Sequence, residues 1–144
     1  MSSVQAASIV PKKHLRRALL ALACAAGAVG AQAQSAMPQW KGEGAVRYVC
    51  GGIGSDESTA MRAAMKDHPL ALLFARSDGA YLADVQVDIK GADGAPSLAL
   101  RASGPVCLVD LPAGRYTIDA AMAGSAKSQT VTVGGGSKTV DFRF

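Results

Sequence analysis

The alternation of apolar and polar residues along positions 70 to 144 constrains the fold of this chain more than any other feature. It is strictest between Tyr81 and Lys90. One face of that stretch would carry Tyr81, Ala83, Val85, Val87 and Ile89. A period of two sends successive side chains to opposite faces of a β-strand, so that one face packs in a core and the other meets solvent. The sequence therefore predicts half-buried strands of the kind found in antiparallel sheets.

Turn residues divide the chain into several such strands. Asp78-Gly79, Asp93-Gly94 and the glycines at 134–136 lie between apolar runs, as expected for turns. The expected strands are 45–50, 70–75, 81–90, 97–102, 106–109, 115–122, 129–133 and 138–144. No alternation of strands with helices indicates a parallel sheet. We predict an all-β fold, an antiparallel β-sandwich of seven or eight strands with one short helix inserted near the N-terminus.

The helix is expected just after the glycine-rich stretch 51–54. Ser55 can cap it, Asp56 and Glu57 would lie in its first turn, and Lys66 at its end, which suits the helix dipole. Four apolar residues at helical spacing would share one face. They are Ala60, Met61, Ala64 and Met65. The pattern predicts an amphipathic helix of about three turns.

The N-terminal segment has the three parts of a secretory signal peptide. Basic residues at positions 12, 13, 16 and 17 precede an apolar run over 18–31, which ends in Ala31-Gln32-Ala33. Small residues at the two recognition positions predict cleavage after Ala33. Residues 1–33 are therefore expected to be a signal peptide, with Gln34 as the first residue of the mature protein.

Two other interpretations of this segment are less favoured. The apolar run of about 14 residues is shorter than the roughly 20 that a membrane-spanning helix needs. Cys24 suggests a lipoprotein, but the expected leucine three positions before it is displaced and almost no apolar stretch precedes it. We expect no stable insertion in the membrane after signal cleavage.

Cleavage also removes the net positive charge of the chain. Four of the 15 Lys and Arg residues lie in 1–33, whereas all 11 Asp and Glu residues lie after it. A nearly neutral mature protein gives no reason to expect a nucleic-acid partner. Its length allows one core, so we expect a flexible lead at 34–44, around Trp40, and a single domain at 45–144.

Two cysteines remain in the mature chain, Cys50 and Cys107. An even number of cysteines in an exported protein predicts a disulfide between them. Two separate buried thiols are the alternative. A catalytic thiol is less favoured, because His68 is the only histidine in the mature chain and nothing else could serve as a base.

A segment near the C-terminus resembles a known family. Residues 106–118 read VCLVDLPAGRYTI, which is similar to the aspartate-leucine-proline-small-glycine-any-tyrosine segment of carboxypeptidase regulatory-like domains. Residues 79–87 resemble the glycine-containing strand of that family, and 131–133 its closing hairpin. Residues 102–105 depart from its pattern, and the resemblance does not account for 45–67. The resemblance covers 70–144 and implies a non-catalytic, transthyretin-like β-sandwich, as in some small exported proteobacterial proteins, with no transferable binding residues.

The residues of that segment also have a direct physical interpretation as a turn. Pro112 fixes φ, and Gly114 can adopt a positive φ. Tyr116 would then return to the core, with its hydroxyl available to a backbone group. Leu111, Pro112, Gly114 and Tyr116 are therefore expected to form a structural turn motif rather than a binding site.

Residue types that could carry chemistry have simpler explanations. The glycines at 51–54 precede a helix but lack the lysine and serine of a phosphate loop. Asp84, Asp88, Asp93 and Asp110 do not have calcium-loop spacing, and one histidine without a thiol cluster makes a zinc site improbable. Asp56 and Glu57 are adjacent and fit capping charges better than a glycosidase pair. We expect no catalytic, cofactor or metal-binding residues.

These features predict an exported, non-catalytic binding or accessory module of the periplasm or cell envelope, and not an enzyme. Its partner would be an unknown protein or glycan, held by the segment from Gly51 to Lys66, with Arg62 and Lys66 on the wet side of the helix. The alternative role for the helix is to cap an open end of the sandwich with Met61 and Met65. The alternative function is a carbohydrate-binding module, although few aromatic residues are left to stack on sugars.

Overall fold

Nine strands and one α-helix make up residues 37–144, the part of the chain that the computed structural model describes. The predicted signal peptide 1–33, including Cys24, lies outside the described residues. The elements are β1 (Lys41–Glu43), β2 (Val46–Gly51), α1 (Ser55–Ala64), the 3-10 turn η1 (Met65–Asp67), β3 (Leu70–Ala75), β4 (Val85–Gly91), β5 (Leu98–Ala102), β6 (Val106–Asp110), β7 (Gly114–Met122), β8 (Ser125–Val133) and β9 (Lys138–Arg143).

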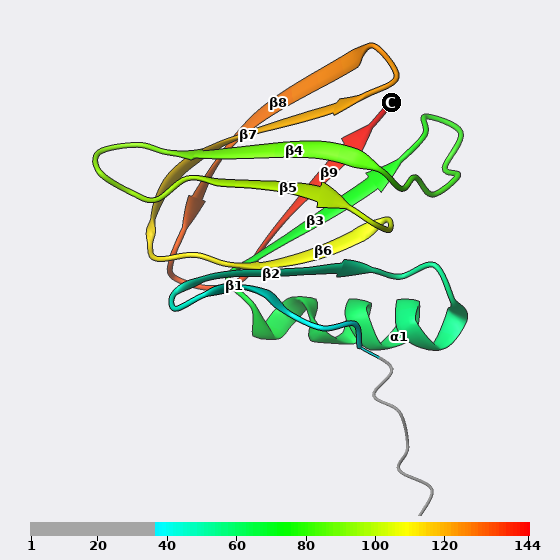
Figure 1. Cartoon of the computed structure of the whole chain (residues 1–144), viewed down its shortest axis with the longest axis horizontal. Helices are drawn as coiled ribbons and strands as arrows, with labels where there is room; N and C mark the ends of the chain where they lie inside the picture. Colours follow the sequence, from blue (N-terminus) through cyan, green and yellow to red (C-terminus); the bar gives the residue numbers. More distant parts are fainter. Residues whose placement is uncertain (1–36) are drawn as a thin grey trace, which may run out of the picture. The chain divides into compact units, whose positions relative to one another are not determined.

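The strands form two sheets that stack face to face (Figure 1). The first sheet has the order β1-β2-β6-β3-β9, and the second has the order β5-β4-β7-β8. Their inner faces share one core, in which the largest fully buried side chains include Tyr116, Phe74, Phe142 and Ile89. The rings of Phe74 and Phe142 stack with centroids 5.7 Å apart. The predicted all-β sandwich is confirmed.

The ninth strand is one more than the seven or eight expected. β1 lies within 34–44, which was expected to be a flexible lead, and it pairs antiparallel with β2 through Lys41 opposite Tyr48 and Glu43 opposite Val46. The two-residue turn between these strands uses Gly44 with φ of 63°. The second half of the lead is therefore an edge strand, which was missed because three exposed residues carry no hydrophobic alternation.

One strand pair is parallel, against the expectation of a purely antiparallel sandwich. β9 runs parallel to β3, with Leu70 opposite Lys138 and Phe74 opposite Phe142. The other pairs formed by these nine strands are antiparallel. β9 enters the first sheet after the β7–β8 hairpin of the second sheet. β9 therefore begins at the same end of the sheet as β3. The backbone N–H of Lys138, the first residue of β9, donates to the carbonyl of Pro69, which directly precedes β3.

The strand predicted to begin at Tyr81 begins at Val85 instead. Its inward residues Val85 and Ile89 are buried as expected, but Tyr81 is exposed and Leu82 packs against the core in its place. The backbone N–H of Leu82 donates to the carbonyl of Phe74 in the first sheet, and that of Asp84 donates to Ala102 in the second. The segment thus crosses from one sheet to the other, and the positive φ of Asp84, 62°, breaks the alternation there.

Helix α1 lies against the outer face of the first sheet, not over an open end of the sandwich (Figure 1). Met61 is completely buried in a second core, against Val49, Ala71, Val106 and Leu108. β3 and β6 are therefore covered on both faces, which explains why their sequences are continuously apolar.

The start of α1 differs from the predicted serine cap. Gly54 occupies the N-cap position and Ser55 is the first helical residue, with no side-chain cap hydrogen bond. Glu57, in the first turn, instead accepts a hydrogen bond of 2.7 Å from the backbone N–H of Gly52. The positive end of the helix dipole also stabilises a carboxylate in that position.

Candidate functional site

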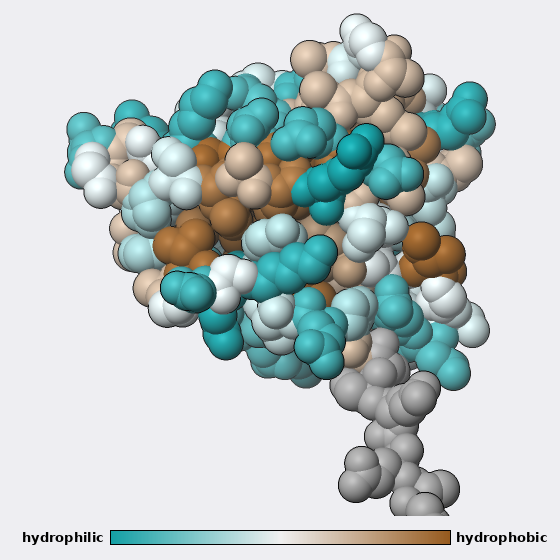
Figure 2. Space-filling view, viewed as in Figure 1, coloured by the Kyte–Doolittle hydropathy of each residue, from teal (hydrophilic) through white to brown (hydrophobic). Residues whose placement is uncertain are grey.

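Exposed apolar side chains gather where the β2–α1 loop meets the crossing segment between β3 and β4. Ile53 and Tyr81 are the large hydrophobic residues most exposed to solvent among residues 37–144, at 74% and 63%. Figure 2 shows a small hydrophobic patch over the β2–α1 loop, and Ile53 belongs to that loop. Exposed apolar residues that are gathered at one place are more informative than scattered ones.

Tyr81 forms a common wall of two cavities at this place. One cavity, which we call the Arg62 groove, has a volume of about 170 Å³ and lies between α1 and β9. Its lining consists of Arg62, Leu73, Phe74, Ala75, Gly79, Tyr81, Pro105, Asp141 and Arg143. The other, the Ile53 hollow, has a volume of about 240 Å³. Its lining consists of Gly52, Ile53, Tyr81, Leu82, Ala83 and Pro105.

Among the described residues 37–144, no acidic side chain pairs with Arg62. Its guanidinium carbon lies 5.0 Å from the centre of the Tyr81 ring, and its Nε donates to the hydroxyl of Ser58 at 3.3 Å. The expectation that Arg62 lies on the wet side of the helix is only half correct, because its side chain is partly buried against Tyr81. Lys66 is exposed as expected, in the turn η1 that follows the helix.

Across the groove, Arg143 is already paired. Its Nε and a terminal nitrogen donate to the two carboxylate oxygens of Asp141 at 3.0 and 3.1 Å. These hydrogen bonds raise the pKa of Arg143, and the neighbouring Tyr81 adds a smaller contribution in the same direction. With Asp141 neutralising one guanidinium, the charged side chains that line the groove leave one net positive charge, which lies on Arg62.

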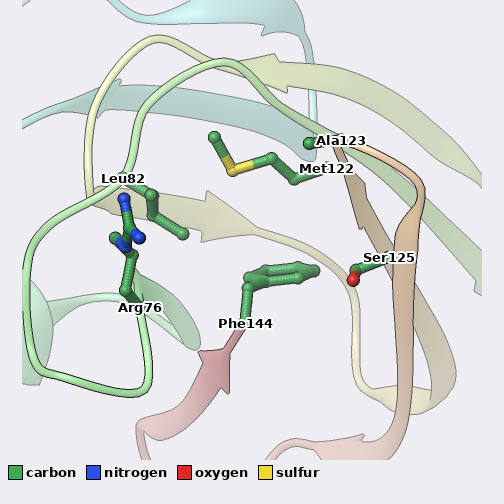
Figure 3. Close-up of a pocket in the computed structure, with 6 residues that line it drawn as sticks. All are labelled: Arg76, Leu82, Met122, Ala123, Ser125 and Phe144. Carbon is green, nitrogen blue, oxygen red and sulfur yellow. The ribbon is translucent and has the colours of Figure 1, made fainter.

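A third cavity opens where the sheets diverge at the far end of β9 (Figure 3). Leu82, Met122 and Phe144 give it apolar walls, while Arg76 and Ser125 supply the polar groups of its lining, with a volume of about 260 Å³. Arg76 makes a long ion pair of 3.9 Å with Asp78, and both side chains are largely exposed. Phe144 was expected to point inward, and it lies at the edge of the core, half buried.

The only tryptophan belongs to a polar cluster on the outer face of the first sheet, the face that α1 covers, where it packs against the second core. The Trp40 ring lies 4.7 Å from the ring of His68, and the Arg47 guanidinium lies 5.2 Å from its centre. Asp110 contacts both neighbours, Arg47 at 3.0 Å and His68 at 2.8 Å. Asp110 was considered as a calcium ligand, and its carboxylate is instead used in these two contacts.

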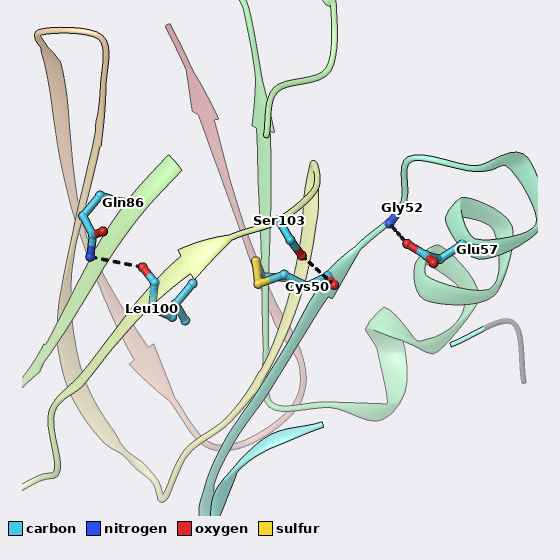
Figure 4. Close-up of a disulfide and its surroundings, with 7 residues drawn as sticks. Cys50, Gly52, Glu57, Gln86, Leu100 and Ser103 are labelled. Carbon is cyan, nitrogen blue, oxygen red and sulfur yellow. Dashed lines mark hydrogen bonds between the residues drawn. A yellow bond between two sulfur atoms is a disulfide. The ribbon is translucent and has the colours of Figure 1, made fainter. Parts of the chain in front are cut away.

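The predicted disulfide is present (Figure 4). Cys50 and Cys107 lie directly opposite each other on β2 and β6, with Cα atoms 4.1 Å apart, and both face the core between the sheets. The Ser103 hydroxyl donates to the carbonyl of Cys50 at 3.1 Å. Next to the bridge, Gly52 donates its N–H to Glu57, so this donor of the glycine-rich stretch is used within the protein rather than offered to an anion.

The turn motif has the expected hydrogen bond of its tyrosine, but Gly114 does not adopt the positive φ that the sequence allowed. The Tyr116 side chain is fully buried, and its hydroxyl donates to the carbonyl of Pro112 at 2.7 Å. Burial also raises the pKa of Tyr116. Leu111 packs at the edge of the core and Gly114 begins β7. In this arrangement the motif is occupied with packing and hydrogen bonding inside the domain.

Within residues 37–144, His, Cys, Asp and Glu side chains form no group of three or more that could hold a metal ion. No helix in the same stretch is long and apolar enough to cross a membrane. The carboxylates Asp84 and Asp119 form surface ion pairs with Arg101 and Lys90.

The fold and its candidate site define a disulfide-linked β-sandwich with a helix on one outer face and a basic groove beside that helix. No family model and no curated protein match the chain. Sequence reasoning found Arg62 but missed the groove, since Arg62, Tyr81 and Arg143 lie far apart in the sequence. An indirect signal was present, because Tyr81 directly follows a turn and so lies where the alternation of a strand is least constrained.

Proposed function

We propose that this protein is an exported, non-catalytic binding or accessory module of the periplasm or cell envelope, built on a carboxypeptidase regulatory-like sandwich. The tripartite pattern of residues 12–33 supports export. The Cys50–Cys107 disulfide is also what an oxidising compartment favours. The resemblance of residues 106–118 to the family motif supports the type of sandwich.

The observation that carries the binding role is the position of Tyr81. An aromatic ring that is 63% exposed, stacked by an arginine and flanked by two cavities is a typical interaction surface. Tyrosine and arginine are enriched among the residues that dominate binding energy at protein interfaces. We therefore assign partner binding to the surface formed by α1 and Tyr81, including Arg62 and Lys66.

A pull-down from the producing cells tests this assignment. The tagged protein is compared with the charge reversals Arg62→Glu and Lys66→Glu. The control is Lys127→Glu, which makes the same type of change on an exposed residue of β8 in the other sheet. We expect the Arg62 and Lys66 variants to lose the partner and the control to keep it. Equal capture by all variants, at unchanged melting temperatures, would exclude this surface.

Mass spectrometry of the protein from the cell envelope tests export separately. We expect Gln34 as the first residue, cyclised or free. A protein that retains Met1, or that carries lipid on Cys24, would contradict cleavage after Ala33.

A carbohydrate-binding module is the second candidate, and the exposure of Tyr81 is the observation that favours it, since tyrosine rings can stack on apolar sugar faces. Arg62, however, already covers the Tyr81 ring, and the Trp40 ring is occupied by His68 and Arg47. Retention of the protein on insoluble polysaccharides, with Tyr81→Ala as the comparison, separates this candidate from a protein partner.

A further inference from the structure

We propose that the Arg62 groove and the Ile53 hollow together bind an extended segment of a partner protein in which an acidic and an aliphatic residue are two positions apart. The proposal rests on the function proposed above and specifies its ligand. Arg62 would receive the carboxylate, and the hollow would receive the aliphatic side chain.

The charge of the groove selects the carboxylate. Arg62 is partly buried and makes no ion pair within residues 37–144, although Arg47, Arg76, Arg101 and Arg143 all do. Stacking on Tyr81 and the hydrogen bond to Ser58 limit the rotation of its side chain while leaving guanidinium donors unused. A fixed guanidinium with free donors matches a carboxylate, which it can bind through two parallel hydrogen bonds.

The hollow selects an aliphatic side chain. Ile53, Leu82, Ala83 and Pro105 contribute apolar surface to its walls, and its volume of about 240 Å³ provides room for one side chain of leucine size. Ile53 is 74% exposed, so covering it would remove apolar surface from water.

The two cavities share Tyr81 as a wall, and this arrangement specifies the spacing of the ligand. Residues i and i+2 of an extended chain point to the same side, and the residue between them points away. A segment that runs across Tyr81 therefore places one residue in the groove and the second residue after it in the hollow. This is why we infer an acidic and an aliphatic residue two positions apart, rather than an isolated carboxylate.

The test uses the purified protein with its disulfide oxidised, and short peptides blocked at both ends that contain a central Glu-Ala-Leu sequence. We expect binding that perturbs the NMR signals of Arg62, Tyr81 and Ile53. Replacing the glutamate by glutamine, or the leucine by serine, should each weaken binding, the first by about tenfold because a charge-assisted hydrogen bond is lost. Equal binding of the glutamate and glutamine peptides would overturn the proposal, as would hexanoate binding as tightly as the Glu-Ala-Leu peptide.

Protein variants locate the binding. Arg62→Gln should weaken it about tenfold, and Arg62→Lys should restore it only in part, because lysine keeps the charge but not the fork of donors. The matched control is Arg115→Gln, since Arg115 is exposed on β7 and also lacks an ion pair. Equal affinities of Arg62→Gln and the control would overturn the assignment to the groove.

Asp141→Asn tests the proposal by an expected gain in peptide affinity rather than a loss. It releases Arg143 from its carboxylate and should tighten peptide binding, because a second guanidinium then faces the ligand. Unchanged or weaker binding would contradict a carboxylate site. If the peptides fail while the pull-down still depends on Lys66, the ligand chemistry is wrong but the partner surface stands.

Discussion

Nδ1 of His68 lies 2.8 Å from one carboxylate oxygen of Asp110, and the other oxygen of that carboxylate binds Arg47. Asp110 ends β6, so a residue from the centre of the first sheet holds both neighbours of Trp40. Trp40 directly precedes β1, the edge strand that the sequence did not predict. Through these contacts, the Asp110 carboxylate attaches the N-terminal residues of the described domain to β6, the central strand of the first sheet.

Asp110→Asn should loosen Trp40. The amide cannot form the ion pair with Arg47, so the packing of Arg47 and His68 against the indole ring should weaken. We expect the fluorescence of this sole tryptophan to become more accessible to acrylamide, with a loss of stability of at most about 1 kcal/mol, as for partly exposed ion pairs. Asp119→Asn makes the same change in the other sheet and serves as the control. Equal quenching in the two variants would show that the contacts of Asp110 with Arg47 and His68 do not hold Trp40 in place.

Tyr116→Phe should destabilise the protein by about 1 kcal/mol, the usual net value of one hydrogen bond. The variant removes the hydroxyl that binds the Pro112 carbonyl and keeps the ring in the core. Chemical denaturation measures the loss. Tyr48→Phe is the matched control, because the Tyr48 hydroxyl makes no hydrogen bond within residues 37–144 and its removal should leave stability unchanged.

Ala123→Asn should stabilise the protein by about 1 kcal/mol, because alanine is poorly suited to left-handed backbone and asparagine tolerates it. Ala123 and Gly124 form the two-residue turn between β7 and β8, with φ of 46° and 81°. Such turns favour Asn-Gly. Thermal unfolding measures the gain. Ala126→Asn, in the exposed part of β8, should give no gain, and a gain at both positions would exclude the turn as its cause.

Reduction of the Cys50–Cys107 disulfide should lower the free energy of unfolding by about 4 kcal/mol, if the bridge acts by restricting the unfolded chain. The bridge closes a separation of 57 residues. Urea unfolding with and without reductant measures the difference. A variant with alanine at both positions is the control and should not respond to reductant. An unchanged midpoint for the native protein would show that the core alone stabilises the sandwich.

Ser128→Ala should raise the pKa of Asp119 toward its ordinary value. The Ser128 hydroxyl, 2.6 Å from the carboxylate, is the main reason that the pKa of Asp119 is lowered, followed by Lys90 at 2.9 Å. A lowered carboxyl pKa favours the folded state above the ordinary pKa, and this contribution disappears as the pH falls through the lowered one. Variant and native protein should therefore differ in stability at neutral pH and converge in acid.

NMR titration of the Asp119 carboxyl measures this shift. Lys90→Gln removes both the hydrogen bond and the charge of the second contact, and should also raise the pKa of Asp119. A larger rise with Lys90→Gln would show that charge, and not the hydroxyl, governs this carboxyl.

Features that depend on neighbouring residues could be predicted from the sequence. Alternation located the core residues Val85 and Ile89, and the spacing of Ala60 and Met61 located the helix. The even number of cysteines predicted the bridge without any knowledge of strand order. In each case the physical signal lies within a few residues, or in a simple count.

Features that depend on which segments meet could not be predicted in the same way. Tyr81 fits the alternation of β4, yet the crossing between sheets turns it outward, because the hydrogen bonds of Leu82 and Asp84 go to different sheets. The position of α1 follows from the continuous apolar sequences of β3 and β6, whose double burial could have been inferred from composition. The groove forms where Arg62 of α1 and Arg143 of β9 lie close together, and this requires β9 to have joined the first sheet.

The parallel pairing of β9 with β3 also sets an order of events in folding. Hairpins such as β7–β8 can form early, because their two strands are adjacent in sequence. β3 and β9 are separated in the sequence by all the strands of the second sheet, so the pairing of Leu70 with Lys138 is expected to form later. Until then β3 has one unpaired edge and the core lacks Phe142. An unpaired apolar strand is open to pairing with other chains. The interval before β9 docks is therefore when this protein is most prone to aggregate.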